Sequence, residues 1–191
     1  LHVRSRRQRQ MCIRDSPSYK VGAQLVEGVR SALGVTRAEA TARVLALLER
    51  VGIADPKRTF DSYPHQISGG MAQRVLIAGA VASRPKLLIA DEPTTALDVT
   101  VQAEILDLLR DLQSELDMAI LLVTHNFGVV ADLCDRIAVM QNGVIVESGT
   151  AAEVFAHPTH EYTKMLLGAI LDESTVRTDP PVAITEEGTQ R

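Results

Sequence analysis

Residues 67–98 read ISGGMAQRVLIAGAVASRPKLLIADEPTTALD, and this stretch decides the fold. Residues 71–83 have the apolar spacing of a helix. Residues 85–91, PKLLIAD, form a short continuous apolar run, which is typical of a parallel strand buried on both faces. A helix that leads into a buried strand predicts an α/β domain built on a parallel sheet.

The start of this helix carries very little side chain. Ser68, Gly69 and Gly70 stand directly before it, and Gln73 lies one turn inside. A helix start exposes unpaired backbone N–H groups and the positive end of the helix dipole, and glycines let a phosphate approach them closely. Ser68 would add a hydroxyl donor. For these residues alone, the alternative is a serine N-cap followed by two flexible glycines.

Two carboxylates, Asp91 and Glu92, follow the apolar run at the carboxyl end of the predicted strand, where ligands bind in open α/β sheets. Asp91 is a candidate Mg²⁺ ligand, and Glu92 is a candidate to orient or deprotonate a water molecule. A second apolar run, AILLVTH (119–125), brings His125 to the same edge, and Asp98 lies between the two runs. The alternatives are a solvated strand end for the carboxylates, a structural role for His125 and a helix N-cap role for Asp98.

The rest of the chain predicts the elements that complete such a domain. Thr36 and Glu39 have the spacing of a capping box at a helix start. The expected elements are helices over 21–33, 37–53, 99–116 and 127–134, a hairpin over 136–149 around Asn142-Gly143, and two short helices within 151–171. Residues 55–66 are expected to form a proline-punctuated loop, and residues 172–191 a linker or disordered tail.

The composition is that of an ordinary globular protein, with 46% hydrophobic and 23% charged residues in a chain of 191. No apolar run approaches the roughly 18 residues that a membrane-spanning helix needs. Aromatic residues make up only 3%, without tryptophan, which argues against a base-stacking platform, so no nucleic-acid partner is expected. Cys12 and Cys134 share no metal or redox spacing, so a reducing cytoplasm is expected.

Residues 1–14 carry five arginines and no acidic residue, although the net charge of the whole chain is −4. A basic arm of this kind usually indicates a nucleic acid or anionic lipid partner. This segment has neither helical nor strand periodicity, and it stops abruptly at Asp15. Residues 1–15 are therefore either foreign or misread sequence, or a genuine binding arm.

Four ordered motifs in the chain resemble those of the ATP-binding cassette (ABC) transporter ATPases. ISGGMAQRV resembles the signature motif, LLIADEP the Walker B motif with its following glutamate, TALD the D-loop, and VTHN the switch-histidine loop. The resemblance covers about residues 16–171 and narrows to the ATPases of dipeptide, oligopeptide and nickel importers. SYKVGAQLVEGVR and VFAHPTHEYTKMLLGAI also resemble segments of that subgroup.

This resemblance implies a P-loop NTPase-like core with a parallel sheet, over about residues 85–171, and a partial α-helical subdomain over about residues 20–84. It also implies that ATP and Mg²⁺ are bound between two cassettes that pair head to tail. Within the subunit, Asp91 would hold Mg²⁺ through water and Glu92 would be the general base for the attacking water. His125 would contact the γ-phosphate and stabilise the transferring group.

The remaining site residues implied by the resemblance act across the dimer. Ser68, Gly69 and Gly70 would touch the γ-phosphate of ATP held by the opposite subunit, with Met71 and Gln73 in the same binding segment. Asp98 would couple the two ATP sites.

The chain departs from the family pattern at its N-terminal side. No GxxxxGK[ST] segment occurs in the sequence, so the phosphate-cradling Walker A loop and its lysine are missing from it. The Q-loop glutamine has no clear position, and Gln8 and Gln10 are poor candidates. Met71 stands where many relatives have glutamine. These departures predict the C-terminal two-thirds of a cassette, N-terminally truncated, behind a foreign N-terminus, and inactive by itself.

In the intact protein, the resemblance implies a nucleotide-binding subunit of an importer, in which ATP hydrolysis drives uptake of peptides or a similar small solute. Its partners would be a second, identical or paralogous cassette, transmembrane permease subunits and, indirectly, an extracytoplasmic solute-binding protein. It would lie on the cytoplasmic face of the cell membrane. The rival hypotheses are a soluble ABC-type ATPase of DNA repair or translation, and an interaction fragment or half of a tandem cassette.

Overall fold

The structure, a computed structural model, describes residues 18–95 and 97–174, with side chains up to residue 169. The described part of the chain divides into two compact units, with the boundary between residues 129 and 130. The expectations for residues 1–15, including Gln8 and Gln10, lie outside the described residues. No helix within the described ranges is long and apolar enough to cross a membrane.

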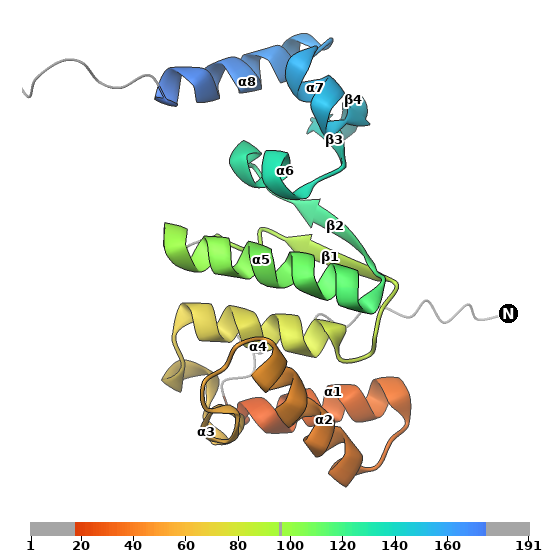
Figure 1. Cartoon of the computed structure of the whole chain (residues 1–191), viewed down its shortest axis with the longest axis vertical. Coiled ribbons are helices and arrows are strands. Elements are labelled where there is room, and N and C mark those ends of the chain that lie inside the picture. Colours follow the sequence, from red (N-terminus) through yellow and green to blue (C-terminus); the bar gives the residue numbers. More distant parts are fainter. Residues whose placement is uncertain (1–17, 96, 175–191) are drawn as a thin grey trace, which may run out of the picture. The chain divides into compact units, whose positions relative to one another are not determined.

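The first unit begins with a group of packed helices (Figure 1). The long ones are α1 (Val21–Leu33), α2 (Arg37–Arg50) and α4 (Gly69–Val81). The predicted capping box at the start of α2 is confirmed: Thr36 Oγ1 accepts from the Glu39 N–H at 3.3 Å, and Glu39 Oε2 accepts from the Thr36 N–H at 2.9 Å. These bonds satisfy backbone donors that a helix start otherwise leaves unpaired.

The prediction that residues 55–66 form a loop is wrong. This segment contains a short helix, α3 (Pro56–Asp61), and a turn of 3-10 helix, η2 (Pro64–Gln66). Asp55 caps α3 by accepting from the Arg58 N–H at 3.0 Å, and Pro56 occupies the first helical turn. Proline is favourable at that position because its missing N–H would have no partner there, so here the prolines start helices instead of interrupting them.

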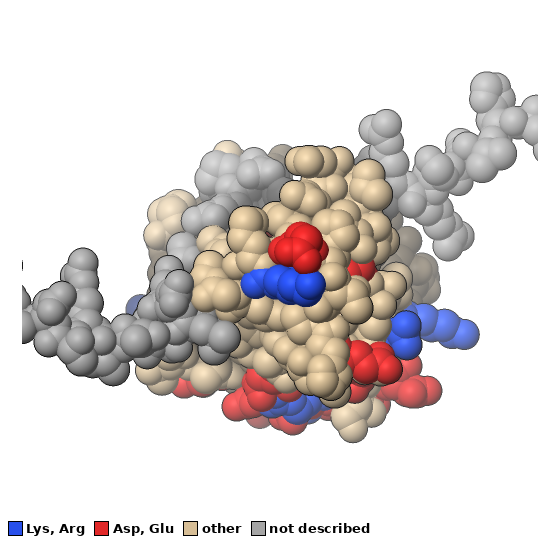
Figure 2. All heavy atoms as spheres, turned by 90° about the horizontal axis from the view of Figure 1, so that it is seen from above, with Lys and Arg blue, Asp and Glu red and all other residues tan. Residues whose placement is uncertain are grey.

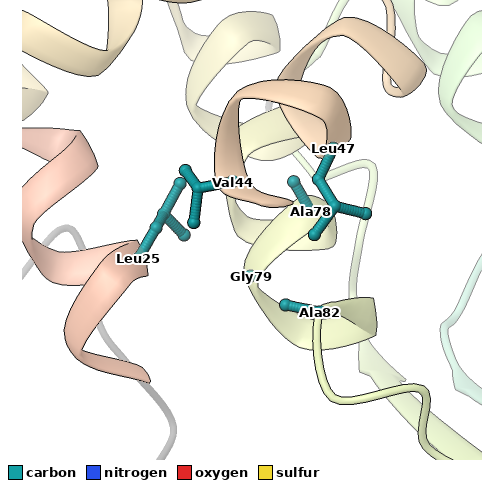
Figure 3. A pocket seen from close by; sticks show the side chains of 6 residues that line it. All are labelled: Leu25, Val44, Leu47, Ala78, Gly79 and Ala82. Carbon is teal, nitrogen blue, oxygen red and sulfur yellow. The ribbon is translucent and has the colours of Figure 1, made fainter. Parts of the chain in front are cut away.

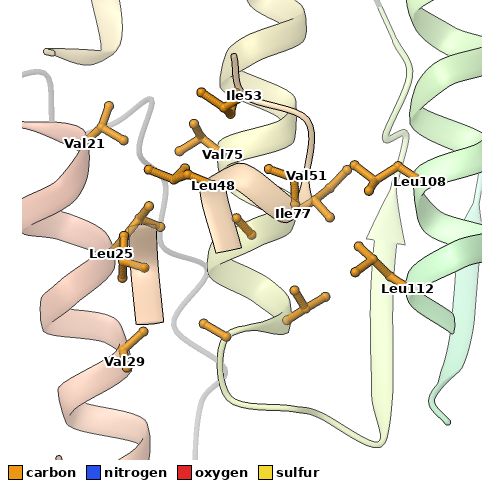
Figure 4. Packing of buried hydrophobic residues seen from close by; sticks show 14 of the residues in the cluster. Val21, Leu25, Val29, Leu48, Val51, Ile53, Val75, Ile77, Leu108 and Leu112 are labelled. Atoms are coloured by element: carbon orange, nitrogen blue, oxygen red, sulfur yellow. The ribbon is translucent and has the colours of Figure 1, made fainter. Parts of the chain in front are cut away.

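The helices enclose one apolar core that also takes in the long helix α5 (Val99–Leu116) (Figure 4). Its largest fully buried members come from α1, α2, α4 and α5, and they include Val21, Val44, Leu48, Val75, Ile105, Leu109 and Leu112. Because α5 shares its core with α1, α2 and α4, these helices pack onto α5, which follows the strand that ends at Asp91.

Two strands of this unit, β1 (Leu87–Asp91) and β2 (Ala119–Val123), are parallel, and α5 connects them. Leu87 pairs with Ala119 and Asp91 with Val123, so both strands end at the same edge. The predicted α/β class with parallel strands is therefore confirmed. His125 lies beyond the end of β2, not within the strand as the apolar run had suggested.

The expectation that these strands are buried on both faces is wrong for the described residues. Leu88 and Ala90 point to the core and are buried. The opposite face is apolar but open to solvent, with Leu87, Ile89, Leu121 and Val123 between 45% and 52% exposed. We call these four residues the open sheet face.

The second unit holds the predicted hairpin and two helices. Its elements are the strands β3 (Arg136–Gln141) and β4 (Val144–Thr150) and the helices α7 (Ala151–Ala156) and α8 (Glu161–Ser174), while α6 (Phe127–Leu133) crosses the boundary between the units. The turn at Asn142-Gly143 has φ of 51° and 80°, as a two-residue hairpin turn requires. Because α8 continues to Ser174, the tail expected from residue 172 begins inside a helix, and residues 175–191 lie outside the described part.

Candidate functional site

Glu92 lies directly after β1 in a strained backbone conformation. Its φ is 47°, in the left-handed region that residues with a Cβ rarely adopt. Its N–H donates to the carbonyl of Val123 at 2.8 Å, so the turn out of β1 is tied to the end of β2. Strain of this kind occurs preferentially at functional sites, where the surrounding structure enforces it.

Both carboxylate oxygens of Glu92 have partners. Oε1 lies 2.7 Å from Nδ1 of His125, and Oε2 accepts from the Thr95 hydroxyl at 2.7 Å. The hydroxyl of Thr95 and then the ring of His125 hold the pKa of Glu92 below its ordinary value. Glu92 is therefore charged at neutral pH and able to accept a proton. The His125 ring is 82% exposed, so it presents most of its surface to a ligand.

Asp91 ends β1 and is exposed beside this pair. Within the described ranges, no group of three or more histidine, cysteine, aspartate or glutamate residues is arranged to hold a metal ion. A magnesium ion that binds with a nucleotide needs only one or two carboxylates, because phosphate oxygens and water supply its other ligands. The exposed carboxylate of Asp91 fits that requirement.

The bare helix start predicted at Ser68 is observed. Ser68 is the N-cap of α4, and its Oγ accepts from the Met71 N–H at 3.3 Å. Ser68 and Gly69 are exposed, whereas Met71 is partly buried against the core and Gln73 is half-buried one turn inside. The N-cap interpretation therefore describes Ser68 correctly, and it leaves the hydroxyl proton and the first N–H groups of α4 available to an anion.

Gly70 has a packing role that sequence reasoning missed. A Cβ on Gly70 would lie 2.9 Å from Cγ1 of Val101 in the first turn of α5, a distance that real Cβ atoms do not show. A Cβ on Gly69 would lie 3.8 Å from Leu97, which is an ordinary contact. Gly70 therefore allows α4 and α5 to start side by side, while Gly69 keeps an open approach to the backbone.

Asp98 begins α5. Its carboxylate accepts from the Val101 N–H at 3.0 Å, so the predicted N-cap alternative is observed. The structure thus brings the site residues together as two clusters. Glu92 and His125 meet beside Asp91 at the strand ends, and the Ser68–Gly70 segment meets the Asp98 end of α5 at two adjoining helix starts.

Sequence reasoning also missed Thr95 and Arg74. Thr95 lies three residues after Glu92, and a hydroxyl at that spacing in a turn can reach back to a carboxylate, which is the signal that would have found it. Arg74 lies within the ISGGMAQRV segment and bridges three helices, but nothing in its spacing along the chain indicates its partners in α2 and α5.

Among the described residues, neither the apolar hollow between the helices nor the face shown in Figure 2 offers a competing site. A small apolar hollow lies among α1, α2 and α4 (Figure 3), and its lining residues are Leu25, Val44, Leu47, Ala78, Gly79 and Ala82. No motif residue lines it. On the face in Figure 2, uncharged residues dominate, and basic side chains of the described part lie beside acidic ones.

Comparison with known proteins shows which sequences this chain resembles. The family model described as ABC transporter matches residues 2–95. The dipeptide transport ATP-binding protein DppD of Haemophilus influenzae is 52% identical over 155 residues, which are 81% of this chain and 47% of that protein. The oligopeptide transport ATP-binding protein OppD of Bacillus subtilis is 51% identical over 155 residues, which are 81% of this chain and 43% of that protein.

Solved structures of ABC proteins have a similar fold. The ATP-binding cassette MJ0796, solved as a dimer in a post-hydrolysis state bound to ADP and Pi, superposes with a TM-score of 0.64 at 27% identity, over 75% of this chain and 60% of that one. The protein cbiO1 of Clostridium perfringens, part of the ABC transporter complex cbiONQ, superposes with a TM-score of 0.62 at 36% identity, over 72% of this chain and 53% of that one.

The chain belongs to the ABC transporter family of ATPases, as its four motifs predict. It spans about half the length of the curated relatives that it matches.

Proposed function

We propose that this chain forms part of the ATP-binding subunit of an importer that takes up peptides or a similar small solute. The observation that carries the proposal is the pair of Glu92 and His125, joined at 2.7 Å beside Asp91 where two parallel strands end. The printed names of the relatives, which are dipeptide and oligopeptide transport proteins, support the importer class.

In this proposal the strand-end cluster carries out hydrolysis. Glu92, charged and fixed by Thr95 and His125, orients the attacking water and accepts its proton. His125 contacts the γ-phosphate of ATP with the part of its ring that Glu92 leaves free. Asp91 holds the Mg²⁺ ion, which would neutralise phosphate charge when bound.

The helix-start cluster, formed by the Ser68–Gly70 segment and Asp98, acts on ATP that is held by a partner cassette. Ser68 and Gly69 are exposed and offer N–H groups to a phosphate held by the other subunit, and Asp98 lies at the adjoining helix start to relay the state of one site to the other. The solved dimeric form of a related cassette supports this pairing. The closing and opening of such a pair would move permease subunits, which places the protein against the cytoplasmic face of the membrane.

The test uses the full-length protein assembled with its permease in proteoliposomes. We expect Glu92→Gln to keep ATP binding and to stop both hydrolysis and peptide uptake, because an amide cannot accept the proton of the water. Glu27→Gln, which changes an exposed glutamate of α1, is the matched control and should leave both activities unchanged.

Near wild-type hydrolysis by Glu92→Gln would overturn the role of Glu92 as base. A protein that does not assemble with a permease, and that hydrolyses ATP without transporting a solute, would instead be a soluble ABC-type ATPase.

A further inference from the structure

Arg74 connects three helices through one guanidinium group. It lies in the second turn of α4, and its side chain is 17% exposed. Nη1 donates to the carbonyl of Val51 at 2.8 Å, at the C-terminus of α2, and Nη2 pairs with Oε2 of Glu104 in α5 at 2.6 Å. The planar fork of arginine is suited to this task because it presents several donors in fixed directions.

The backbone at the end of α2 favours the contact with Arg74. Val51 follows the last turn of α2, where carbonyl groups lack helical partners and attract a cation. The next residue is Gly52, whose φ is 80° and on which a Cβ would lie 2.9 Å from Nη1 of Arg74. Glycine at this position therefore leaves room for the guanidinium as well as permitting the turn.

The contact with α5 lies next to the helix-start cluster. Glu104 is in the second turn of α5, as Arg74 is in the second turn of α4. One turn earlier in both helices, Gly70 and Val101 are in close contact. The Arg74–Glu104 ion pair thus closes the next turn of the same helix pair, and it limits how far the two helix starts can slide or separate.

We propose that Arg74 is a positioning residue for ATP hydrolysis. Through Glu104 and Val51 it fixes the Ser68–Gly70 segment relative to Asp98, so that the N–H groups of one helix start and the carboxylate of the other meet the partner cassette in one geometry. This inference rests on the proposed function. Positioning matters because phosphoryl transfer depends mainly on the placement of charged and polar groups, and small misplacements are costly.

The chain offers a matched control in a second ion pair between the same helical layers. Arg50 of α2 pairs with Glu115 of α5 at 2.6 Å, near the end of α5 that is far from Asp98. Like Arg74 it joins α5 to the helical part, but it is not adjacent to the helix starts. A purely structural role predicts that the loss of either pair lowers kcat only in step with the melting temperature.

The test compares Arg74→Gln, Glu104→Gln, their double variant, Arg74→Lys and Arg50→Gln in the full-length protein assembled with its permease. We expect Arg74→Gln to lower kcat about tenfold while KM for ATP changes less than about twofold. Arg50→Gln should leave kcat unchanged at a similar melting temperature. Arg74→Lys should recover only part of kcat, because an ammonium lacks the fork that serves two acceptors.

If the pair acts as one unit, the double variant should lose no more kcat than Arg74→Gln alone. Glu104→Gln keeps Arg74 bonded to Val51 and removes only an exposed carboxylate, so it remains informative if Arg74→Gln folds poorly. An unchanged kcat in both Arg74→Gln and Glu104→Gln, or an equal loss in Arg50→Gln, would overturn the positioning role.

Wild type and Glu92→Gln, measured alongside, separate the two proposals. If wild type hydrolyses ATP, Glu92→Gln does not, and Arg74→Gln matches Arg50→Gln, then only the positioning role fails. A permease-bound wild type that hydrolyses no ATP would overturn both.

Discussion

Thr95 holds one carboxylate oxygen of Glu92 while His125 holds the other, and the two contacts leave the side chain of Glu92 little freedom. Of the two, the Thr95 hydroxyl is the larger cause of the lowered pKa of Glu92. A base that is charged but restrained in this way gives up some intrinsic basicity for a defined position.

We expect Thr95→Val in the full-length protein to lower kcat about tenfold, because the carboxylate loses a charge-assisted hydrogen bond and with it a fixed orientation. Thr95→Ser, which keeps the hydroxyl, is the control and should retain most of the activity. Steady-state hydrolysis at saturating ATP measures both. Equal rates in Thr95→Val and wild type would show that His125 alone orients Glu92.

Gly69 and Gly70 differ in what a side chain would meet. Any substitution at Gly70 combines an effect on phosphate approach with a collision against Val101, whereas Gly69 has room for a Cβ. Gly69 is therefore the position at which the proposed contact with a partner's phosphate can be tested without disturbing the packing of α4 on α5.

We expect Gly69→Asp to abolish hydrolysis by the assembled protein while its melting temperature stays within about 2 °C of wild type. An acidic residue is favourable in the first turn of a helix, but it repels an approaching phosphate. ATP binding to the separate subunit should be unchanged. Gly69→Ala controls for bulk, and loss of ATP binding by the separated Gly69→Asp subunit would place this segment in the site of its own subunit.

At the scale of elements, Glu147 of β4 fixes the start of α8. Its Oε1 accepts from the N–H of Thr159 at 2.7 Å and from the Thr159 hydroxyl at 2.8 Å, and its Oε2 accepts from the N–H of His160 at 3.1 Å. The Thr163 hydroxyl, which belongs to a fully buried residue of α8, is the main cause that lowers the pKa of Glu147 to about 2, followed by the N–H of Thr159.

This pKa makes the attachment of α8 dependent on pH at the acidic end. Because the folded-state value of about 2 lies below the ordinary 4.5, the charged form stabilises the attachment above pH 4.5, and this stabilisation is lost as the pH falls from 4.5 through about 2. We expect Glu147→Gln to expose the α8 amides to hydrogen exchange at pH 6, and the difference from wild type to shrink towards pH 3.

Glu161→Gln is the control for Glu147, since Glu161 is exposed and pairs with Lys164 in the next turn of the same helix. It should change the exchange of α8 little at either pH. Equal protection of α8 in Glu147→Gln and wild type at pH 6 would show that apolar packing alone holds this helix.

In the molecule as a whole, the open sheet face is the surface that most favours aggregation. Exposed leucine, isoleucine and valine side chains on paired strands favour association with other chains. The sequence also has no GxxxxGK[ST] segment to cradle the β- and γ-phosphates, and an exposed helix start and two carboxylates do not replace one.

We therefore expect residues 1–191, expressed alone, to aggregate and to bind ATP only weakly. Ile89→Lys, on the open sheet face, should raise the soluble fraction, whereas Leu88→Lys, on the buried face, should lower it by placing a charge in the core. Size-exclusion chromatography and calorimetry measure the two properties. Micromolar ATP binding by a monodisperse sample of this chain would contradict the expectation.

Most elements of the fold could be predicted from sequence because their signals are local. The capping box at Thr36, the amphipathic spacing of α5 and the Asn142-Gly143 turn each act through neighbours in the chain. The sequence pattern did not predict the helix over residues 56–61, because Pro56 was expected to interrupt regular structure, although proline after an aspartate N-cap is a start signal. The apolar runs of the strands indicated burial on both faces, but they carry no information on which face another segment covers.

By itself, the sequence determined the class of the domain and the candidate site residues at the strand ends and the helix start, because these depend on residue types at fixed spacings. Only the tertiary structure decided which of them meet. The bond between Glu92 and His125 joins residues far apart in the chain, Gly70 depends on Val101 of another helix, and Arg74 reaches α2 and α5 at once. Such contacts follow from how the helices and strands pack, and no local pattern encodes their distances.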